Sequence, residues 1–162
     1  MLACGWVGLT VAKNYHSRPW ELRFLCSALQ MLETEIVYAS TPLPDALKKI
    51  AGRIQNPVTL LFETASNTLK TGEGCSAGEA WTAALKKYTQ VTSLIKADLD
   101  ILYSFGHGLG ASDKNEQVKI LQLTREQLKN QEISAETERI KNEQIWRMLG
   151  FLIGLVIVFI VF

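Results

Sequence analysis

The residues that could carry out chemistry are few and lie far apart in the chain. His16 and His107 are the two histidines, and neither has a carboxylate or a cysteine at the spacing of a metal site. The run Gly106-His-Gly108-Leu-Gly110 looks suited to phosphate, but phosphate loops follow a strand and open a helix. This run follows a predicted helix, which indicates a turn between helices with His107 capping the helix end.

Two pairs of acidic residues are candidates for a general acid and a general base. Glu33 and Glu35 are two positions apart, as are Asp98 and Asp100, and this spacing places the two acids on different faces of a helix. The serines are expected mainly at helix caps and turns rather than in a nucleophile elbow. We therefore expect no enzyme activity, no metal or other cofactor and no small-molecule substrate.

The C-terminal residues 148–162, MLGFLIGLVIVFIVF, carry no charged or polar side chain. A helix that is apolar all round must be buried in protein or in lipid. Its length of roughly 22 Å, at ~1.5 Å per residue, is below the ~30 Å of a hydrocarbon core and by itself favours a buried helix. Its terminal position and the flanking Trp146 and Arg147, as interfacial anchors, favour a transmembrane segment. We expect membrane insertion, with a core helix or an oligomer seam as the alternative.

Gly150 and Gly154 lie four positions apart in this segment. The G-x-x-x-G spacing lets membrane helices pack closely, which predicts helix–helix packing at these two residues. Glycine is also common in membrane helices that have no such interface, and this alternative stays open.

The N-terminal residues 1–12 repeat the apolar character in a shorter form. They are too short for a full span, so we expect an N-terminal hydrophobic anchor that is incomplete as it stands. Lys13 and Arg18 follow this segment, and Arg147 precedes the last one, where cations would lie at the membrane interface. The positive-inside tendency then places residues 13–147 in the cytoplasm.

The composition excludes some classes of partner and cross-link. The net charge is +1, and no basic cluster covers one face, so we expect no nucleic-acid partner. Cys4, Cys26 and Cys75 are odd in number and lack a C-x-x-C motif. They are predicted to be small apolar residues in a reducing compartment rather than a disulfide framework.

Prolines and glycines divide residues 13–147 into predicted helices. Ser17-Arg18-Pro19 is expected to open the first helix, with Glu21 and Glu33 on its outer side. Further helices are expected at about 41–53, 57–70, 76–88 and 90–105, the third opened by a capping box between Ser76 and Glu79. Almost nothing alternates with period two, so the prediction is an all-α, multi-helix bundle. Five apolar residues at alternating spacings of three and four form the core seam of the first helix: Leu22, Leu25, Leu29, Leu32 and Ile36.

The last predicted helix begins after a cap at Ser112-Asp113 and has no glycine or proline before Gly150. If it is continuous, it has about 49 residues and a length of roughly 73 Å at ~1.5 Å per residue. Apolar residues are scarce between Lys129 and Gln144, which predicts a solvated, partly unpacked stalk between the bundle and the membrane. The alternative is the charged face of an ordinary packed helix.

The order and spacing of short motifs resemble one known family, the stage III sporulation protein AB family of endospore-forming bacteria. The resemblance covers the chain from about Gly5, apart from an N-terminus that looks shorter than in the family. Its marks include Ala28-Leu29-Gln30, Leu32-Glu33-Thr34-Glu35-Ile36, Pro57-Val58, Ala80-Trp81, Phe105-Gly106, Lys141-Asn142-Glu143 and Leu149-Gly150-Phe151-Leu152.

The resemblance implies a fold like the cytoplasmic domain of the type II secretion F platform protein. It also implies a non-enzymatic platform in the channel between mother cell and forespore, required for sporulation after engulfment. The implied location is the mother-cell membrane around the forespore, with the helical domain in the mother-cell cytoplasm. The implied partners are other stage III sporulation channel proteins, in particular the secretion-type ATPase (the AA protein). The residues themselves predict membrane lipid as a further partner, and they leave open whether the helix that packs at Gly150 and Gly154 is a second copy of the chain or a different channel component.

A second class of function stays open. The chain could instead be a membrane-tethered helical adaptor that binds a soluble cytoplasmic partner without a transport role. Neighbouring genes for a secretion-type ATPase and a ring-forming membrane protein would favour the channel.

Overall fold

The computed structural model describes the backbone of residues 2–55, 57–72, 74–110 and 114–161, and the side chains of residues 17–55, 57–72, 74–110 and 115–143. Within these ranges every regular element is helical. The elements are α1 (Leu2–Thr34), a π-helical turn η1 (Glu35–Ala39), α2 (Leu43–Ala51), α3 (Val58–Thr71), α4 (Ala77–Tyr88), α5 (Lys96–Gly108) and α6 (Lys114–Val161). The predicted all-α bundle is confirmed.

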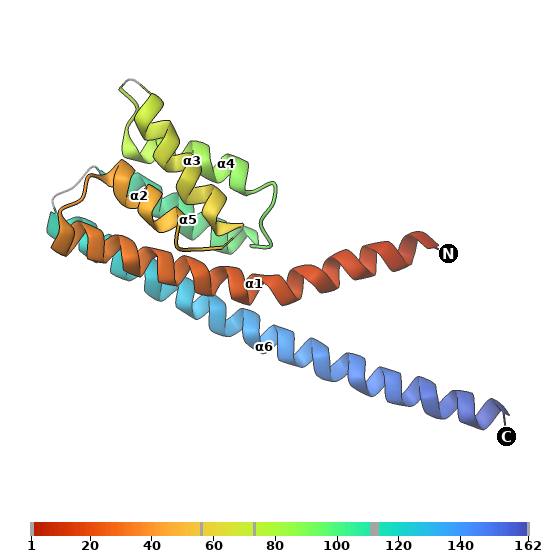
Figure 1. Ribbon diagram of the computed structural model, residues 1–162. Coiled ribbons are helices and arrows are strands. Elements are labelled where there is room, and N and C mark those ends of the chain that lie inside the picture. The colour runs from red at the N-terminus through yellow and green to blue at the C-terminus, as the bar shows by residue number, and fades with distance from the viewer. Residues whose placement is uncertain (1, 56, 73, 111–113, 162) are drawn as a thin grey trace.

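The helices form two layers (Figure 1). The long helices α1 and α6 lie antiparallel and side by side, and the four short helices α2 to α5 cover them on one side. Both α1 and α6 extend beyond the bundle in the same direction, toward the two chain termini. We call this the proximal end of the bundle and the opposite one, where α5 ends and α6 begins, the distal end.

One apolar core joins the two layers. The seam of α1 is buried as predicted, since Leu22, Leu25, Leu29 and Leu32 are each at most 1% exposed, and Ile36 is partly buried against the same core. Its largest buried side chains from the short helices are Phe62, Trp81, Tyr88 and Phe105.

The first helix begins earlier than predicted. Pro19 lies inside α1 rather than in its first turn, because α1 already starts at Leu2. A proline within a helix removes one hydrogen bond and bends the axis, and here the helix continues on both sides of Pro19. Figure 1 shows such a bend between the N-terminal arm of α1 and the part that packs on α6.

Two other helix starts also differ from the prediction. α2 begins at Leu43 rather than at about residue 41, because Pro42 takes the N-cap position and the Thr41 hydroxyl donates to the Glu35 carboxylate at 3.0 Å. The helix expected from about residue 90 begins only at Lys96. Residues 89–95 form a turn and an irregular connection instead, and their polar groups bond to a buried acid described below.

α6 is continuous, but the prediction that it forms a solvated stalk beyond Lys129 is wrong for most of that segment. Leu128, Glu132 and Ala135 are buried at 0%, 4% and 3% exposure, so α6 is packed against the bundle well beyond Lys129. The alternative interpretation, a packed helix with a charged outer face, is correct to about Glu138, because α1 supplies partners for the polar residues on the inner face. In the part of the chain that the structure describes, no helix is both long and apolar enough to cross a membrane.

Candidate functional site

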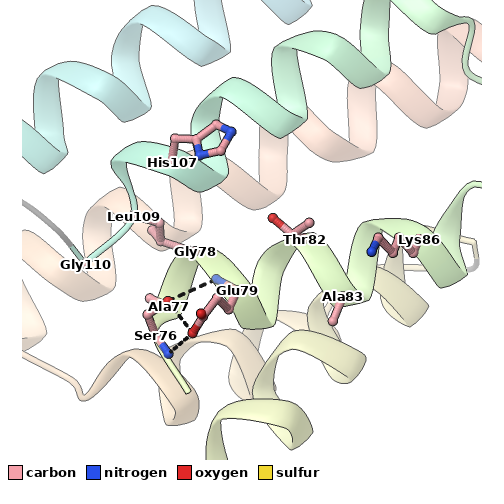
Figure 2. A pocket seen from close by; sticks show the side chains of 10 residues that line it. All are labelled: Ser76, Ala77, Gly78, Glu79, Thr82, Ala83, Lys86, His107, Leu109 and Gly110. Carbon is pink, nitrogen blue, oxygen red and sulfur yellow. Dashed lines mark hydrogen bonds between the residues drawn. The ribbon is translucent and has the colours of Figure 1, made fainter. Parts of the chain in front are cut away.

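A surface groove of about 610 Å³ lies at the distal end, between the start of α4 and the end of α5 (Figure 2). Residues of α4 from Ser76 to Lys86 line one side, and His107, Leu109 and Gly110 line the other. The walls are mainly small side chains, and the exposed polar residues among them are Ser76, Glu79, Lys86 and His107. The groove is open to solvent rather than an enclosed chamber.

Residues 74–78, Gly-Cys-Ser-Ala-Gly, match the G-x-S-x-G pattern of a serine nucleophile. The surrounding structure does not fit that role, because Ser76 follows a loop from α3 rather than a strand. Its hydroxyl donates to Glu79 Oε2 at 2.8 Å and accepts from the Glu79 backbone N–H at 3.2 Å. In Figure 2 the His107 ring points away from Ser76.

The Ser76–Glu79 pair is instead the predicted capping box. Besides the two bonds of the serine hydroxyl, the Ser76 N–H donates to the Glu79 carboxylate at 2.8 Å. These bonds lower the pKa of Glu79, since they stabilise its charged form. The serine hydroxyl is occupied in holding the start of α4, so the groove contains no activated nucleophile.

The glycines around the groove allow close contact between α4 and α5. A Cβ at Gly78 would lie 2.7 Å from the Gly106 carbonyl oxygen, and one at Gly106 would lie 2.6 Å from the indole of Trp81. The Trp81 indole N–H donates to the Leu102 carbonyl at 2.9 Å. The glycine-rich run thus brings α5 against α4, and His107 lies within the last turn of α5 rather than beyond its end.

A buried polar network occupies the proximal end, and it centres on Arg18. The Arg18 guanidinium donates to both carboxylate oxygens of Asp98, at 2.8 and 3.0 Å, and the two side chains are 7% and 0% exposed. It also donates to Gln131 at 3.0 Å and to Glu138 at 3.3 Å on α6. Arg18 thus joins α1, α5 and α6, and we call these four residues the arginine clamp. The structure thus places Arg18, which the sequence analysis assigned to the membrane interface, in ion pairs inside the bundle.

A second buried acid lies beside the clamp. Glu21, which is 3% exposed, accepts hydrogen bonds from the Tyr88 hydroxyl, the Thr92 hydroxyl and the Ser93 backbone N–H at 2.9 Å. Burial, followed by the charge of Glu21, raises the pKa of Tyr88 far above its usual range and keeps the phenol protonated. The predicted outward position of Glu21 is wrong, because the end of α4 and the loop after it supply the donors for its carboxylate.

Ion pairs continue along the contact between α1 and α6. Glu132 accepts from Arg23 at 2.9 Å and from Lys129 at 2.8 Å. Burial by itself would raise its pKa, but these two cations lower the pKa of Glu132 overall. Glu33 was predicted on the outer side, yet its carboxylate lies 3.2 Å from the Arg125 guanidinium and accepts from Gln122 at 2.8 Å.

The remaining predicted site residues belong to the ends of α1 and α6. Lys13, Trp146, Arg147, Gly150 and Gly154 lie within helical backbone, but their side chains are outside the described residues. Their assigned roles at the membrane therefore stay predictions. In the described ranges there is also no cluster of three or more His, Cys, Asp or Glu side chains that could hold a metal ion.

Comparison with known proteins identifies the family. The model of stage III sporulation protein AB matches residues 1–162. The chain belongs to the stage III sporulation protein AB family. The family member of Bacillus subtilis (strain 168) is 40% identical over 158 residues, which cover 98% of this chain and 92% of that protein. A solved structure of stage III sporulation protein AB (SpoIIIAB) matches with a TM-score of 0.73 and 38% identity, over 77% of this chain and 98% of that one.

The family resemblance predicted from the sequence is thus confirmed, and the structure explains several residues that carried it. Ala80-Trp81 and Phe105-Gly106 form one packing unit, in which Trp81 and Phe105 meet edge to face with ring centres 5.1 Å apart. Leu29 and Leu32 belong to the buried seam of α1. These motifs of the sporulation family maintain helix packing, and none of them places reactive groups together.

Proposed function

We propose that this protein is a non-enzymatic, membrane-anchored platform of the channel complex between mother cell and forespore. In this proposal the helical bundle lies in the mother-cell cytoplasm, and the apolar residues 1–12 and 148–162 hold it at the membrane. The family supports a role in sporulation. The channel, its location and its partners are parts of our proposal.

One observation carries this proposal: α1 and α6 leave the bundle in the same direction (Figure 1). Their outer parts contain the two apolar stretches of the sequence. Two helices that run together toward one side can approach a single bilayer surface without passing through the bundle. The same arrangement leaves the distal end and its groove free to contact proteins in the cytoplasm.

We propose that the distal end binds the secretion-type ATPase of the same set, the AA protein, and that other channel proteins or a second copy contact the membrane segments. The groove at the distal end is open, and its small side chains would allow a partner helix or loop to lie close to the backbone of α4. Lys86 provides an exposed cation for an acidic partner.

Membrane attachment and orientation can be tested by thiol labelling. A cysteine-free protein with one cysteine at the exposed position Lys70 should be shielded from an impermeant reagent in intact mother cells. It should react fully after permeabilisation. Ready labelling in intact cells, with cytoplasmic control proteins unlabelled, would reverse the proposed orientation.

Partner binding can be tested by cross-linking and co-purification from sporulating cells. Lys86→Glu, in the groove, should reduce recovery of the ATPase. The matched change Lys48→Glu, at an exposed position on α2 outside the groove, should not. Equal recovery with both variants would argue against the groove as the ATPase contact.

If Gly150 and Gly154 form an interface, replacing both with leucine should leave the protein in the membrane fraction but lower recovery of channel proteins and spore yield.

A further inference from the structure

We infer that the proximal end of the bundle holds a binding site for a basic side chain, a lysine or an arginine, of a partner protein. The site is a hollow of about 450 Å³ between α1, the start of α3 and the loop after α4. Its lining includes Trp20, Glu21 and Phe24 of α1, Pro57 before α3, and Val91 and Ser93 of the loop. The inference goes beyond the proposed function and does not depend on it, because the bundle alone builds the site.

The acid of this hollow, which we call the acidic hollow, is the buried side chain of Glu21. Glu21 is 3% exposed, and its carboxylate accepts hydrogen bonds from the Tyr88 hydroxyl, the Thr92 hydroxyl and the Ser93 backbone N–H. All three donors are neutral. Within the described ranges, no lysine or arginine nitrogen lies within 4.0 Å of this carboxylate. A buried carboxylate without an opposite charge is costly, so a cation is the ligand that Glu21 would bind best.

The cations near the acidic hollow are engaged elsewhere or lie outside it. Arg18, one turn before Glu21 on α1, is bound by the two carboxylates of the arginine clamp. Arg23 pairs with an acid of α6, and neither Arg23 nor the exposed Lys96 is among the residues that line the hollow. Of the described lining residues, Glu21 alone is charged. The hollow therefore presents a negative potential to an incoming group.

The walls of the acidic hollow suit an organic cation rather than a metal ion. Trp20 and Phe24 are aromatic, with ring centres 6.5 Å apart, and Pro57 and Val91 are apolar. A guanidinium or ammonium group is attracted to an aromatic ring, and its aliphatic stem packs on apolar walls. Trp20 and Val91 are 52% and 55% exposed, so a side chain can enter from solvent. One carboxylate supplies too few oxygen ligands for calcium or magnesium.

A protein side chain fits the acidic hollow better than a lipid headgroup does. The ammonium group of a zwitterionic phospholipid is joined to a phosphate, which the Glu21 carboxylate would repel. If residues 1–12 enter the bilayer as proposed, Trp20 lies about 12 Å along α1 from their end, at ~1.5 Å per residue. That distance exceeds the roughly 5–8 Å depth of a headgroup layer. Arginine in contact with aromatic residues is, in contrast, common at the centre of protein–protein interfaces.

The first test measures binding of a small probe to the full chain in a nonionic detergent. The probe is the tripeptide acetyl-Gly-Arg-Gly-amide, and its control is the same peptide with citrulline, which has a similar shape and no charge. The tryptophans carry a 5-fluoro label, and Trp20→Phe assigns the Trp20 resonance. The arginine peptide should shift this resonance saturably, and the citrulline peptide should bind roughly tenfold more weakly or worse. Equal binding of the two peptides, or no binding of either, would overturn the site.

Variants of the chain identify the residue that binds the cation. Glu21→Gln should weaken binding of the arginine peptide roughly tenfold or more, whereas Glu126→Gln, at an exposed position on α6, should not. Val91→Arg tests the same point at an exposed loop position if Glu21→Gln does not fold, because its guanidinium would occupy the hollow and exclude the probe. Val91→Gln, the uncharged control, should bind within about threefold of the unaltered chain. Equal binding by the two Val91 variants would contradict the acidic hollow.

Photo-cross-linking in sporulating cells tests whether the cation belongs to a protein. Benzoylphenylalanine replaces Gln90, the exposed residue next to Val91. It should form a product with another protein, and mass spectrometry should place the cross-link near a lysine or an arginine of that protein. The product should decrease with Val91→Arg but not with Val91→Gln. A product with lipid alone, or one that Val91→Arg leaves unchanged, would overturn the assignment to a protein side chain.

Discussion

The two ends of the helical bundle are held together by opposite means. At the proximal end, the charged side chains of Arg18 and Asp98 are buried and join three helices. At the distal end, glycines let α4 and α5 touch backbone to backbone, as at Gly78 and the Gly106 carbonyl. The first arrangement depends on pairing of charge, whereas the second depends on the absence of a side chain.

This difference bears on what each end can tolerate. A buried ion pair adds little net stability compared with a well-packed apolar substitute, but it is very costly to break from one side. A close contact at a glycine has no such asymmetry, because the free-energy cost of a substitution there rises with the number of atoms added. The proximal end should therefore be sensitive to the loss of a single charge, and the distal end to the gain of a single methyl group.

The largest expected effect comes from removing one partner of the arginine clamp. Asp98→Ala leaves the Arg18 guanidinium buried without its main acceptor, and it should lower the free energy of unfolding by about 3–5 kcal/mol. The measurement is chemical denaturation of the full chain in mild detergent. The double change Arg18→Met with Asp98→Leu should recover most of the loss, except for about 1 kcal/mol from the missing cap, because Asp98 also accepts from the Ile95 N–H. If Asp98→Ala lowered the free energy of unfolding by less than the double change does, the result would contradict the arginine clamp.

A smaller loss is expected at the distal end. Gly106→Ala places a Cβ 2.6 Å from the Trp81 ring, and this overpacking should cost about 1–3 kcal/mol. Gly52→Ala is the matched control, because its Cβ would meet nothing closer than a carbonyl oxygen at 3.7 Å, and it should stay within about 0.5 kcal/mol. Equal effects of the two changes would mean that α4 and α5 do not depend on close contact.

The dependence of stability on pH should report the ion pairs of α1 and α6. Because the pKa of Glu132 is lowered from its usual 4.5 in the folded chain, its stabilisation is present above that pH and is lost as the pH falls through the folded value. Glu132→Gln should cost roughly 0.5–1 kcal/mol at neutral pH and should make stability less sensitive to acid. Denaturation of both proteins at pH values above and below 4.5 checks this, and parallel pH profiles would contradict it.

An effect of similar size is expected farther along the same contact. Glu33→Lys removes the pair with Arg125 and places two cations together, but the site is only half-buried, so the cost should be about 0.5–1 kcal/mol. Glu33→Gln, which keeps an acceptor for Gln122, should cost less. A loss as large as that of Asp98→Ala would extend the sensitivity of the proximal end along the whole of α1.

Local patterns were readable from the sequence. The leucine seam of α1 follows from helical spacing, and the Ser76–Glu79 capping box follows from two residues three positions apart. Both depend on neighbours within one helix. The starts of α2 and α5 were misplaced because Thr41 bonds to Glu35 of η1 and residues 89–95 bond to Glu21 of α1, instead of following their own local preference.

The polar core was not readable in the same way. Arg18 and Asp98 are 80 residues apart, and nothing near either residue indicates its partner. Arg18 next to a proline and an apolar stretch has the sequence context of a surface cation, and Glu21 that of a solvated face. A clue was present only in the scarcity of apolar residues on α6 after Lys129, since a helix packed there needs polar partners across the contact.

The antiparallel contact of α1 with α6 also constrains when the domain can form during synthesis. The first helix emerges from the ribosome long before its main neighbour, and the clamp joins residues as far as 120 positions apart. Contacts between such distant parts of a chain are slow to form, and exposed apolar surface before they form invites aggregation. The leucines of α1 therefore gain their contacts with α6 only after almost the whole chain has been translated. A nascent chain that stops before α6 would present the seam as a hydrophobic surface for chaperones.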